Sequence, residues 1–274
     1  MTGQEKAGAP QGMPGGSWRV GDHEFHSRLI VGTGKYVTWD LMREAIQASG
    51  TELVTVAVRR VNIDQPDEPS LLEYVPKNVA LLPNTAGAYT VEEAVLTARL
   101  ARAAGLGSLV KLEVIGDADL LWPDPVGTYE ATRQLVDDGF TVMVYTTPDP
   151  VLARRLAEAG AAAVMPLGSP IGSGQGVLDV SAVALIKQRI DVPVVVDAGI
   201  GSPADAALAI EAGADAVLIN TAIADAQHPV QMAQAMRLAV DAAFLGRAAG
   251  PMARRNRAAA SSPGTGMVAA PTKS

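Results

Sequence analysis

Short runs of apolar, mostly β-branched residues alternate along the chain with longer segments in which apolar residues recur every three or four positions. The short runs predict buried strands, and the longer segments predict helices that cover them. About eight strands are expected, at residues 28–33, 53–58, 79–82, 109–115, 141–145, 162–166, 192–197 and 216–220. The clearest helices are expected at residues 91–104, 126–138, 150–159, 180–190, 203–212 and 230–245.

The ends of these helices carry signals of their own. Four helices are followed by a glycine, which readily takes the left-handed conformation that ends a helix: Gly105, Gly139, Gly160 and Gly213. Three are preceded by a residue whose side chain can cap the first turn: Thr90, Asp149 and Ser202. These signals support the helix boundaries that the periodicity predicts.

A strand followed by a helix, repeated about eight times, predicts a parallel sheet with crossover helices. In a chain of this length it favours an α/β fold of the (β/α)8 TIM type. A doubly wound open sheet competes, but the strand number and the lack of a glycine fingerprint after the first strand disfavour it. We expect a catalytic barrel over 17–249, a flexible N-terminal tail over 1–16 and a basic flexible C-terminal tail over 250–274. The second unit is poorly defined, because residues 62–74 hold four acidic residues and two prolines, and it predicts a long loop with a short helix.

Composition excludes several classes of protein. A net charge of −7 argues against nucleic-acid binding, which needs a basic surface. The sequence has no apolar run long enough for a membrane span and no secretory signal, so no membrane association and a cytoplasmic location are expected. It also has no cysteine, which excludes disulfides, thiolate metal sites and a cysteine nucleophile. The three histidines are scattered, and neither a metal nor a cofactor is expected.

Lys111 and Glu113 are charged residues inside an otherwise apolar strand. Alternate residues of a strand share a face, and burying charge there is costly unless the groups are paired or perform chemistry. Active sites of such barrels lie at the C-terminal ends of the strands, a rule that also selects Asp117 and, at the end of the seventh strand, Asp197. An amine beside carboxylates suggests a Schiff-base lysine with proton-transfer partners. A purely structural ion pair is the alternative, and burial and the carboxylates act on the lysine pKa in opposite directions.

Three segments after the last strands favour phosphate binding, namely residues 168–176, 198–202 and 220–223. The first two are rich in glycine, which lets a backbone approach a ligand closely. Barrels of this type often bind phosphate with the loops after the seventh and eighth strands. Arg59 and Arg60 follow the second strand and suit anion recognition, unless they pair with nearby acidic residues. Lys35, after the first strand, is a rival amine that we expect to be more exposed than Lys111.

Between Arg28 and Ala249 an ordered set of motifs resembles bacterial thiazole synthase. The motifs lie at residues 32–36, 58–60, 82–87, 111–115, 166–172 and 197–201. The resemblance implies synthesis of the thiazole phosphate of thiamine from 1-deoxy-D-xylulose 5-phosphate, dehydroglycine (2-iminoacetate) and sulfur. The sulfur would arrive on a ubiquitin-like sulfur-carrier protein with a C-terminal thiocarboxylate, and another enzyme would supply the dehydroglycine. The absence of cysteine agrees with sulfur that is delivered by another protein.

The resemblance also implies roles for individual residues. Lys111 matches the Schiff-base lysine of the family, and Glu113 and Asp197 match its acid–base carboxylates. Five further positions match those that hold the sugar phosphate: Gly172, Ala198, Gly199, Asn220 and Thr221. A homo-oligomer, dimer or tetramer, is the default expectation. Two alternatives stay open: another Schiff-base phosphosugar barrel, of the aldolase or pyridoxal-phosphate synthase type, and a non-catalytic phosphometabolite-binding barrel.

Overall fold

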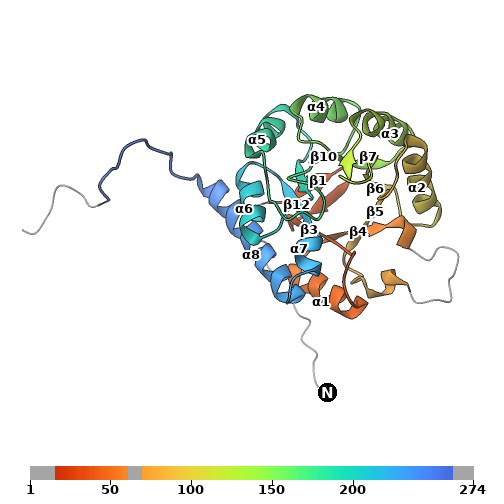
Figure 1. Cartoon of the computed structure of the whole chain (residues 1–274), viewed down its shortest axis with the longest axis horizontal. Helices are drawn as coiled ribbons and strands as arrows, with labels where there is room; N and C mark the ends of the chain where they lie inside the picture. Colours follow the sequence, from red (N-terminus) through yellow and green to blue (C-terminus); the bar gives the residue numbers. More distant parts are fainter. Residues whose placement is uncertain (1–15, 61–69, 262–274) are drawn as a thin grey trace, which may run out of the picture.

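The computed structural model describes residues 16–60 and 70–261, and these form a barrel of parallel strands enclosed by helices (Figure 1). Eight strands form one sheet in the order β10-β9-β6-β5-β4-β3-β12-β11, and every neighbouring pair is parallel. Two parallel bridges, Val164 to Val194 and Leu167 to Asp197, join the two edges and close the barrel. The predicted (β/α)8 barrel is confirmed. Its strands are β3 (Leu29–Gly32), β4 (Leu53–Ala57), β5 (Ala80–Asn84), β6 (Leu109–Leu112), β9 (Thr141–Thr146), β10 (Ala163–Pro166), β11 (Val195–Asp197) and β12 (Ala216–Ile219).

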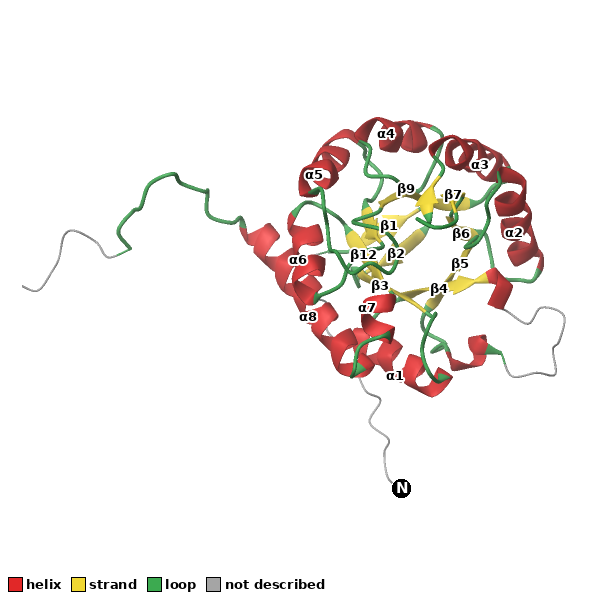
Figure 2. Ribbon diagram, in the orientation of Figure 1, coloured by secondary structure: helices red, strands yellow, loops and turns green. Residues whose placement is uncertain are grey.

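The helices lie around the outside of the barrel, as Figure 2 shows. They are α1 (Trp39–Ser49), α2 (Val91–Ala103), α3 (Pro125–Asp137), α4 (Pro150–Glu158), α5 (Val180–Arg189), α6 (Pro203–Glu211), the short α7 (Thr221–Ala224) and α8 (Pro229–Ala249). The predicted caps are confirmed: Thr90, Asp149 and Ser202 each accept a hydrogen bond from the first turn of their helix. The four glycines expected at helix ends all have positive φ. Two 3-10 turns, Val58–Arg60 and Leu71–Tyr74, stand in the second unit, where a long loop with a short helix was expected.

The inside of the barrel changes from apolar to polar along the strands. Toward the N-terminal ends of the strands, the interior is a buried apolar cluster that includes Leu109, Met143 and Val195. Two residues further along the same strands, on the same face, lie Lys111, Tyr145 and Asp197. A second and larger cluster fills the space between the strands and the helices. The polar groups are therefore confined to the C-terminal end of the barrel.

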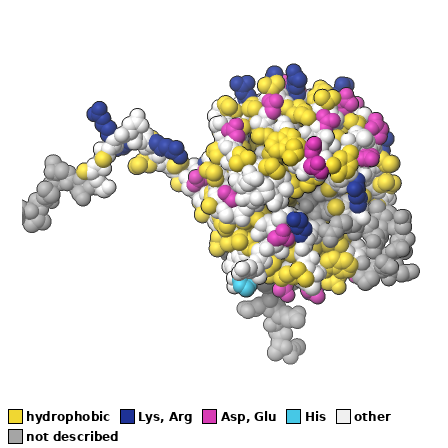
Figure 3. Space-filling model, in the orientation of Figure 1, with side chains coloured by type: hydrophobic (Ala, Val, Ile, Leu, Met, Phe, Trp, Pro, Cys, Tyr) yellow, Lys and Arg dark blue, Asp and Glu magenta, His cyan; other side chains and the backbone are white. Residues whose placement is uncertain are grey.

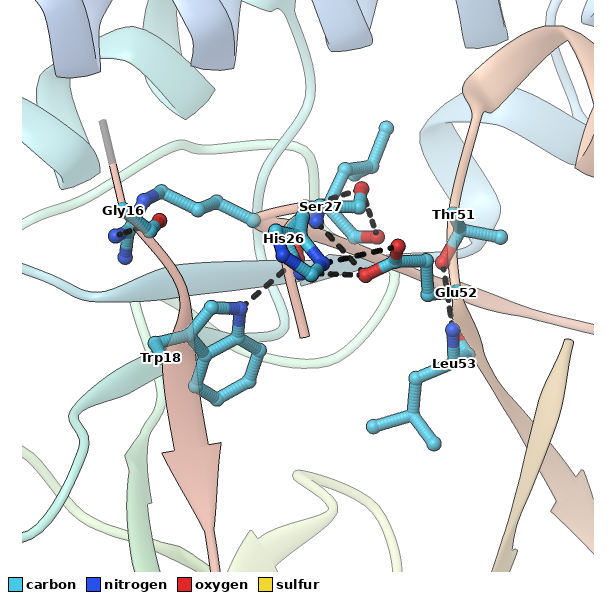
Figure 4. A network of polar contacts seen from close by, with 9 residues as sticks. Gly16, Trp18, His26, Ser27, Thr51, Glu52 and Leu53 are labelled. Carbon is cyan, nitrogen blue, oxygen red and sulfur yellow. Dashed lines mark hydrogen bonds and ion pairs between the residues drawn. The ribbon is translucent and has the colours of Figure 1, made fainter. Parts of the chain in front are cut away.

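A hairpin that the periodicity did not predict packs against the interior at the N-terminal ends of the strands. It consists of β1 (Trp18–Val20) and β2 (His23–Phe25), and its apolar side chains belong to the cluster inside the barrel. Glu52 holds the segment that follows β2 in place. Its Oε2 accepts hydrogen bonds from the backbone N–H groups of His26 (2.5 Å) and Ser27 (3.0 Å) (Figure 4). The Trp18 indole donates to the Ser27 carbonyl oxygen at 2.9 Å. The hairpin therefore covers the N-terminal end of the barrel interior.

Several predicted elements differ from those observed. The run at 109–115 is not one strand: β6 ends at Leu112, and Ile115–Asp117 pairs instead with Trp122–Pro123 as the small hairpin β7–β8. The segment 220–223 was expected to be a loop, but it opens the helix α7. The predicted C-terminal tail is exposed over residues 250–261 and forms no helix or strand there (Figure 1). The predicted N-terminal tail, except Gly16, and the end of the C-terminal tail lie outside the described residues.

Candidate active site

A cavity of about 570 Å³ opens at the C-terminal end of the barrel. Its lining includes all eight residues that the sequence selected as catalytic or substrate-binding: Lys111, Glu113, Gly172, Asp197, Ala198, Gly199, Asn220 and Thr221. They come from four different strand ends or the loops that follow them, those of β6, β10, β11 and β12. Closure of the barrel is what brings them together.

Lys111 lies between two carboxylates at the base of this cavity. Its Nζ is 2.5 Å from Asp197 Oδ2 and 3.1 Å from Glu113 Oε1. All three side chains are at most 7% exposed. The ring of Tyr145 lies beside the amine, with its centroid 5.5 Å from Lys111 Nζ. A buried amine in contact with two carboxylates can exchange a proton with either of them without solvent.

The ionisation of these groups is set by competition between burial and charge. Burial lowers the pKa of Lys111, but Asp197 and Glu113 together outweigh it and hold that pKa above its ordinary value. Burial also raises the pKa of Asp197, as does the charge of Glu113, and the cation of Lys111 only partly opposes this rise. The resting amine is therefore a cation. Asp197, its nearer partner, binds a proton more readily than an ordinary carboxyl because its pKa is raised.

The chain around Glu113 is held by a buried threonine from the neighbouring strand end. Thr85 Oγ1 accepts from the Glu113 backbone N–H and donates to the Glu113 carbonyl oxygen, both at 2.8 Å. The Thr85 backbone N–H donates to the Lys111 carbonyl oxygen at 3.1 Å. Beyond Glu113, the Ile115 backbone N–H donates to the Ala88 carbonyl oxygen at 2.9 Å. These bonds to Thr85 and Ala88 hold the segment after β6 that carries Glu113, whose carboxylate contacts the amine.

The other five selected residues line the cavity from the loops after β10 and β11 and from the start of α7. Gly172 and Gly199 have φ of +73° and +79°, and Ala198 has φ of +73°, a conformation that residues other than glycine rarely adopt. A Cβ on Gly199 would stand 1.9 Å from Ser169 Oγ, so glycine is required there. The Asn220 amide nitrogen, in the orientation that satisfies its neighbours, donates to the carbonyl oxygens of Gly34 (3.0 Å) and Gly32 (3.2 Å). These contacts tie the loop after β3 to the start of α7.

Some residues that the sequence singled out lie elsewhere. Asp117 is on the outer hairpin β7–β8, where its Oδ1 accepts from the backbone N–H groups of Asp119 and Leu120, and it does not line the cavity. Lys35 is about half exposed, as expected, and pairs with Asp225. The Arg59 guanidinium donates to the Gly87 carbonyl oxygen near the rim, and the acidic residues proposed as its partners lie outside the described residues.

The sequence reasoning missed Tyr145 and Asp225. Tyr145 is buried, and burial together with the charges of Asp197 and Glu113 raises the pKa of its hydroxyl. The rule that selected Lys111 selects Tyr145 too, because it lies at the C-terminal end of β9. Asp225 follows α7, whose four residues are too short to give a periodic signal.

Within residues 16–60 and 70–261, no three His, Asp or Glu side chains group in a way that could hold a metal ion. None of the helices in the same ranges is both long and apolar enough to cross a membrane.

Comparison with known proteins places this barrel among close relatives. The profile of the family described as "Thiazole biosynthesis protein ThiG" matches residues 19–263. A thiazole synthase from Anoxybacillus flavithermus is 54% identical over 250 residues, covering 91% of this chain and 98% of that protein. A thiazole synthase from Zymomonas mobilis is 53% identical over 257 residues, covering 93% of this chain and all of that protein (100%).

Solved structures give the same picture of the fold. The crystal structure of the Amycolatopsis orientalis BexX/CysO complex contains a chain that matches with a TM-score of 0.79 at 35% identity, over 88% of this chain and 98% of that one. Thiamine phosphate pyrophosphorylase from Pyrococcus furiosus matches with a TM-score of 0.53 at 14% identity, over 78% of this chain and 95% of that one. The second likeness shows a shared barrel fold and nothing more.

Proposed function

The chain belongs to the thiazole synthase family and is an enzyme of thiamine thiazole biosynthesis, and we propose that it works through an imine on Lys111. The observation that carries this proposal is the buried contact of Lys111 with Asp197 and Glu113 at the base of the cavity. The proposed substrates are 1-deoxy-D-xylulose 5-phosphate, dehydroglycine and the thiocarboxylate of a sulfur-carrier protein.

The first step is attack of the neutral Lys111 amine on the ketone of the sugar phosphate. Asp197 is the nearer base, at 2.5 Å, and receives the proton that makes the amine nucleophilic. The addition product then loses water, and a carboxylic acid donates the proton that the departing hydroxyl needs. The raised pKa of Asp197 suits it to this exchange, because it binds a proton more readily than an ordinary carboxyl.

The later steps need a second base on the same face of the substrate. Glu113 lies 3.1 Å from the amine and takes a proton from the carbon next to the imine, which gives the enamine. The thiocarboxylate sulfur then adds, acyl transfer follows, and condensation with dehydroglycine closes the ring. Two carboxylates around one amine can accept and return these protons in turn.

The phosphate of the sugar is proposed to lie against the loops that follow β10, β11 and β12. The position of a Cβ on Gly172 is open, with only Lys35 Nζ at 4.0 Å, and Ala198, Gly199, Asn220 and Thr221 complete this side of the cavity. A ketone next to Lys111 and a phosphate on these loops would lie in the same cavity.

A sulfur-carrier protein is the proposed macromolecular partner. BexX, which shares this fold at a TM-score of 0.79, was solved in a complex with CysO, and this supports docking of a second protein on the present chain. Sulfur must come from outside, since the chain has no cysteine to carry it. A separate enzyme that supplies dehydroglycine, a homo-oligomeric state and a cytoplasmic location complete the proposal.

Borohydride trapping tests the imine directly. The protein is incubated with the sugar phosphate, reduced and digested, and mass spectrometry locates the adduct. We expect it on the peptide that contains Lys111 and not on the peptide that contains Lys35. The Lys111→Ala variant should form none; an unchanged adduct in that variant would refute the assignment.

Product formation with and without the thiocarboxylated carrier separates this reaction from the other Schiff-base barrels. Thiazole phosphate should form only when the carrier and dehydroglycine are both present. An aldolase or a pyridoxal-phosphate synthase would use the same lysine chemistry without the carrier. Saturable binding of the sugar phosphate that survives Lys111→Ala, with no reducible adduct, would indicate a binding protein.

A further inference from the structure

The cavity is poorly suited by charge to the substrate proposed for it. Among the described residues that line it, one side chain is cationic, Lys111, and three are carboxylates: Glu113, Asp197 and Asp225. The charge of Lys111 is already engaged by the first two. Asp225 lies on the side of α7, where the phosphate is proposed to bind, and an unopposed carboxylate there would repel a dianion.

Lys35 is the cation that reaches this side. Its Nζ lies 3.5 Å from Asp225 Oδ2. The same Nζ lies 4.0 Å from the position that a Cβ on Gly172 would occupy. Lys35 therefore stands between the acidic residue that follows α7 and the glycine loop after β10. In Figure 3, adjacent basic and acidic side chains are seen over the position of α7.

The backbone around Lys35 is held in a conformation that fixes the position from which its side chain extends. Lys35 has φ of +69°, which a residue with a Cβ adopts only under constraint from its surroundings. Asn220 supplies part of that constraint through its hydrogen bonds to the carbonyl oxygens of Gly32 and Gly34. The side chain itself is 53% exposed, and that of Asp225 is 54% exposed, so both ends of the pair can move.

We propose that Lys35 is a phosphate-binding residue that leaves Asp225 for the phosphate of the substrate. In the empty cavity Asp225 neutralises Lys35 and holds it at the rim. A bound phosphate, with a charge near −2, competes for the same ammonium group and forms the stronger contact. Asp225 then lowers the affinity of the cavity for weakly charged ligands, because a ligand without a phosphate cannot displace Lys35 from Asp225. This inference rests on the proposed function, which supplies the phosphorylated sugar.

The test measures the rate of borohydride-trapped adduct against sugar-phosphate concentration in the full chain. Lys35→Gln should raise the half-saturating concentration about tenfold, the effect of losing one charged hydrogen bond, and leave the rate at saturation within about twofold. Lys35→Arg should stay within about threefold of the wild type because it keeps the charge. Asp225→Asn should lower the half-saturating concentration about two- to threefold, because it removes the competitor.

Inorganic phosphate as a competitor gives a second readout that concerns the phosphate alone. Its inhibition of adduct formation should weaken in Lys35→Gln and strengthen in Asp225→Asn. Lys187→Gln is the matched control, because Lys187 also pairs with an aspartate, Asp215 at 2.7 Å, and does not line the cavity. It removes the same charge and should change neither quantity.

Three results would overturn the inference. The first is an unchanged half-saturating concentration in Lys35→Gln. The second is weaker binding in Asp225→Asn, as expected if the pair only shapes the loop. The third is loss of the adduct at every concentration in Lys35→Gln, which would make Lys35 the amine that reacts. If the wild type forms no adduct, the proposed function fails, and that failure is distinct from all three.

Discussion

Replacement of Lys111 by methionine is the most informative perturbation, because it removes the cation and keeps most of the apolar volume. Asp197 and Glu113 then remain buried without the amine, which lies 2.5 Å and 3.1 Å from them in the native protein. At an effective dielectric constant near 20, each lost attraction amounts to roughly 5–7 kcal/mol, and desolvation of the amine offsets a large part. Breaking a buried pair by removing one partner costs about 3–5 kcal/mol. We expect a loss of that size at pH 7.

The pH dependence of this loss shows whether uncompensated carboxylate charge is its cause. The pKa of Asp197 is already raised in the folded protein, and loss of Lys111 removes the cation that opposes this rise, so that pKa rises further. A group with a raised folded pKa contributes stability that is present below its unfolded pKa and lost as the pH rises through its folded pKa. The deficit relative to the wild type should therefore shrink as the pH falls toward the unfolded pKa of the carboxyl, by at most about 1.4 kcal/mol per pH unit. Acidification protonates a carboxyl and removes the uncompensated charge.

Urea denaturation of both proteins at pH 5, 6 and 7 measures this deficit. The double variant Lys111→Met with Asp197→Asn is the control, since it lacks the carboxylate with the closer contact. It should recover at least about 2 kcal/mol of the loss at pH 7 and show a flatter pH dependence. A deficit that is constant or grows toward low pH would refute the view that the three groups form a buried ionised cluster.

Two further predictions concern the glycine loops and the N-terminal end of the barrel. In urea denaturation, Gly199→Ala should destabilise the protein by about 2–4 kcal/mol, because its Cβ would collide with Ser169. Gly139 has the same φ of +79° but open space around it, so Gly139→Ala should cost only about 1 kcal/mol. A cost for Gly139→Ala as large as that for Gly199→Ala would show that backbone strain and not the collision dominates. Glu52→Ala should cost about 1–2 kcal/mol, because two backbone N–H groups lose their acceptor, and the emission of Trp18 should shift to longer wavelength at a lower urea concentration. An unchanged unfolding midpoint would contradict that anchoring role.

The regular parts of the fold could be predicted from the sequence because their signals are local. The periodicity of α4 and the cap at Asp149 lie within one helix, and the structure places that helix within one residue of its prediction. Strands β1 and β2 were missed because each has only three residues, too few for a period to appear. The end of β6 was missed because the run to Ile115 stays apolar, although the last part pairs with a different segment.

The site could be predicted only in part. The strand-end rule selected Lys111, Glu113 and Asp197, and the structure brings them into contact. It also selected Asp117, which the β7–β8 hairpin directs away from the cavity. Asp225 carried no signal, because its importance depends on a contact with Lys35 from the far end of the sequence.

The sequence by itself determined the barrel, and it predicted the end of the barrel at which the candidate site lies and the amine at the centre of that site. These follow from periodicity and from the direction of parallel strands, which are properties of neighbouring residues. Only the tertiary structure decided that Lys111 rests as a cation, with a raised pKa, and that Lys35 pairs with Asp225. The physical reason is that burial and Coulomb attraction oppose each other, and their balance depends on distances between side chains that closure of the barrel alone sets.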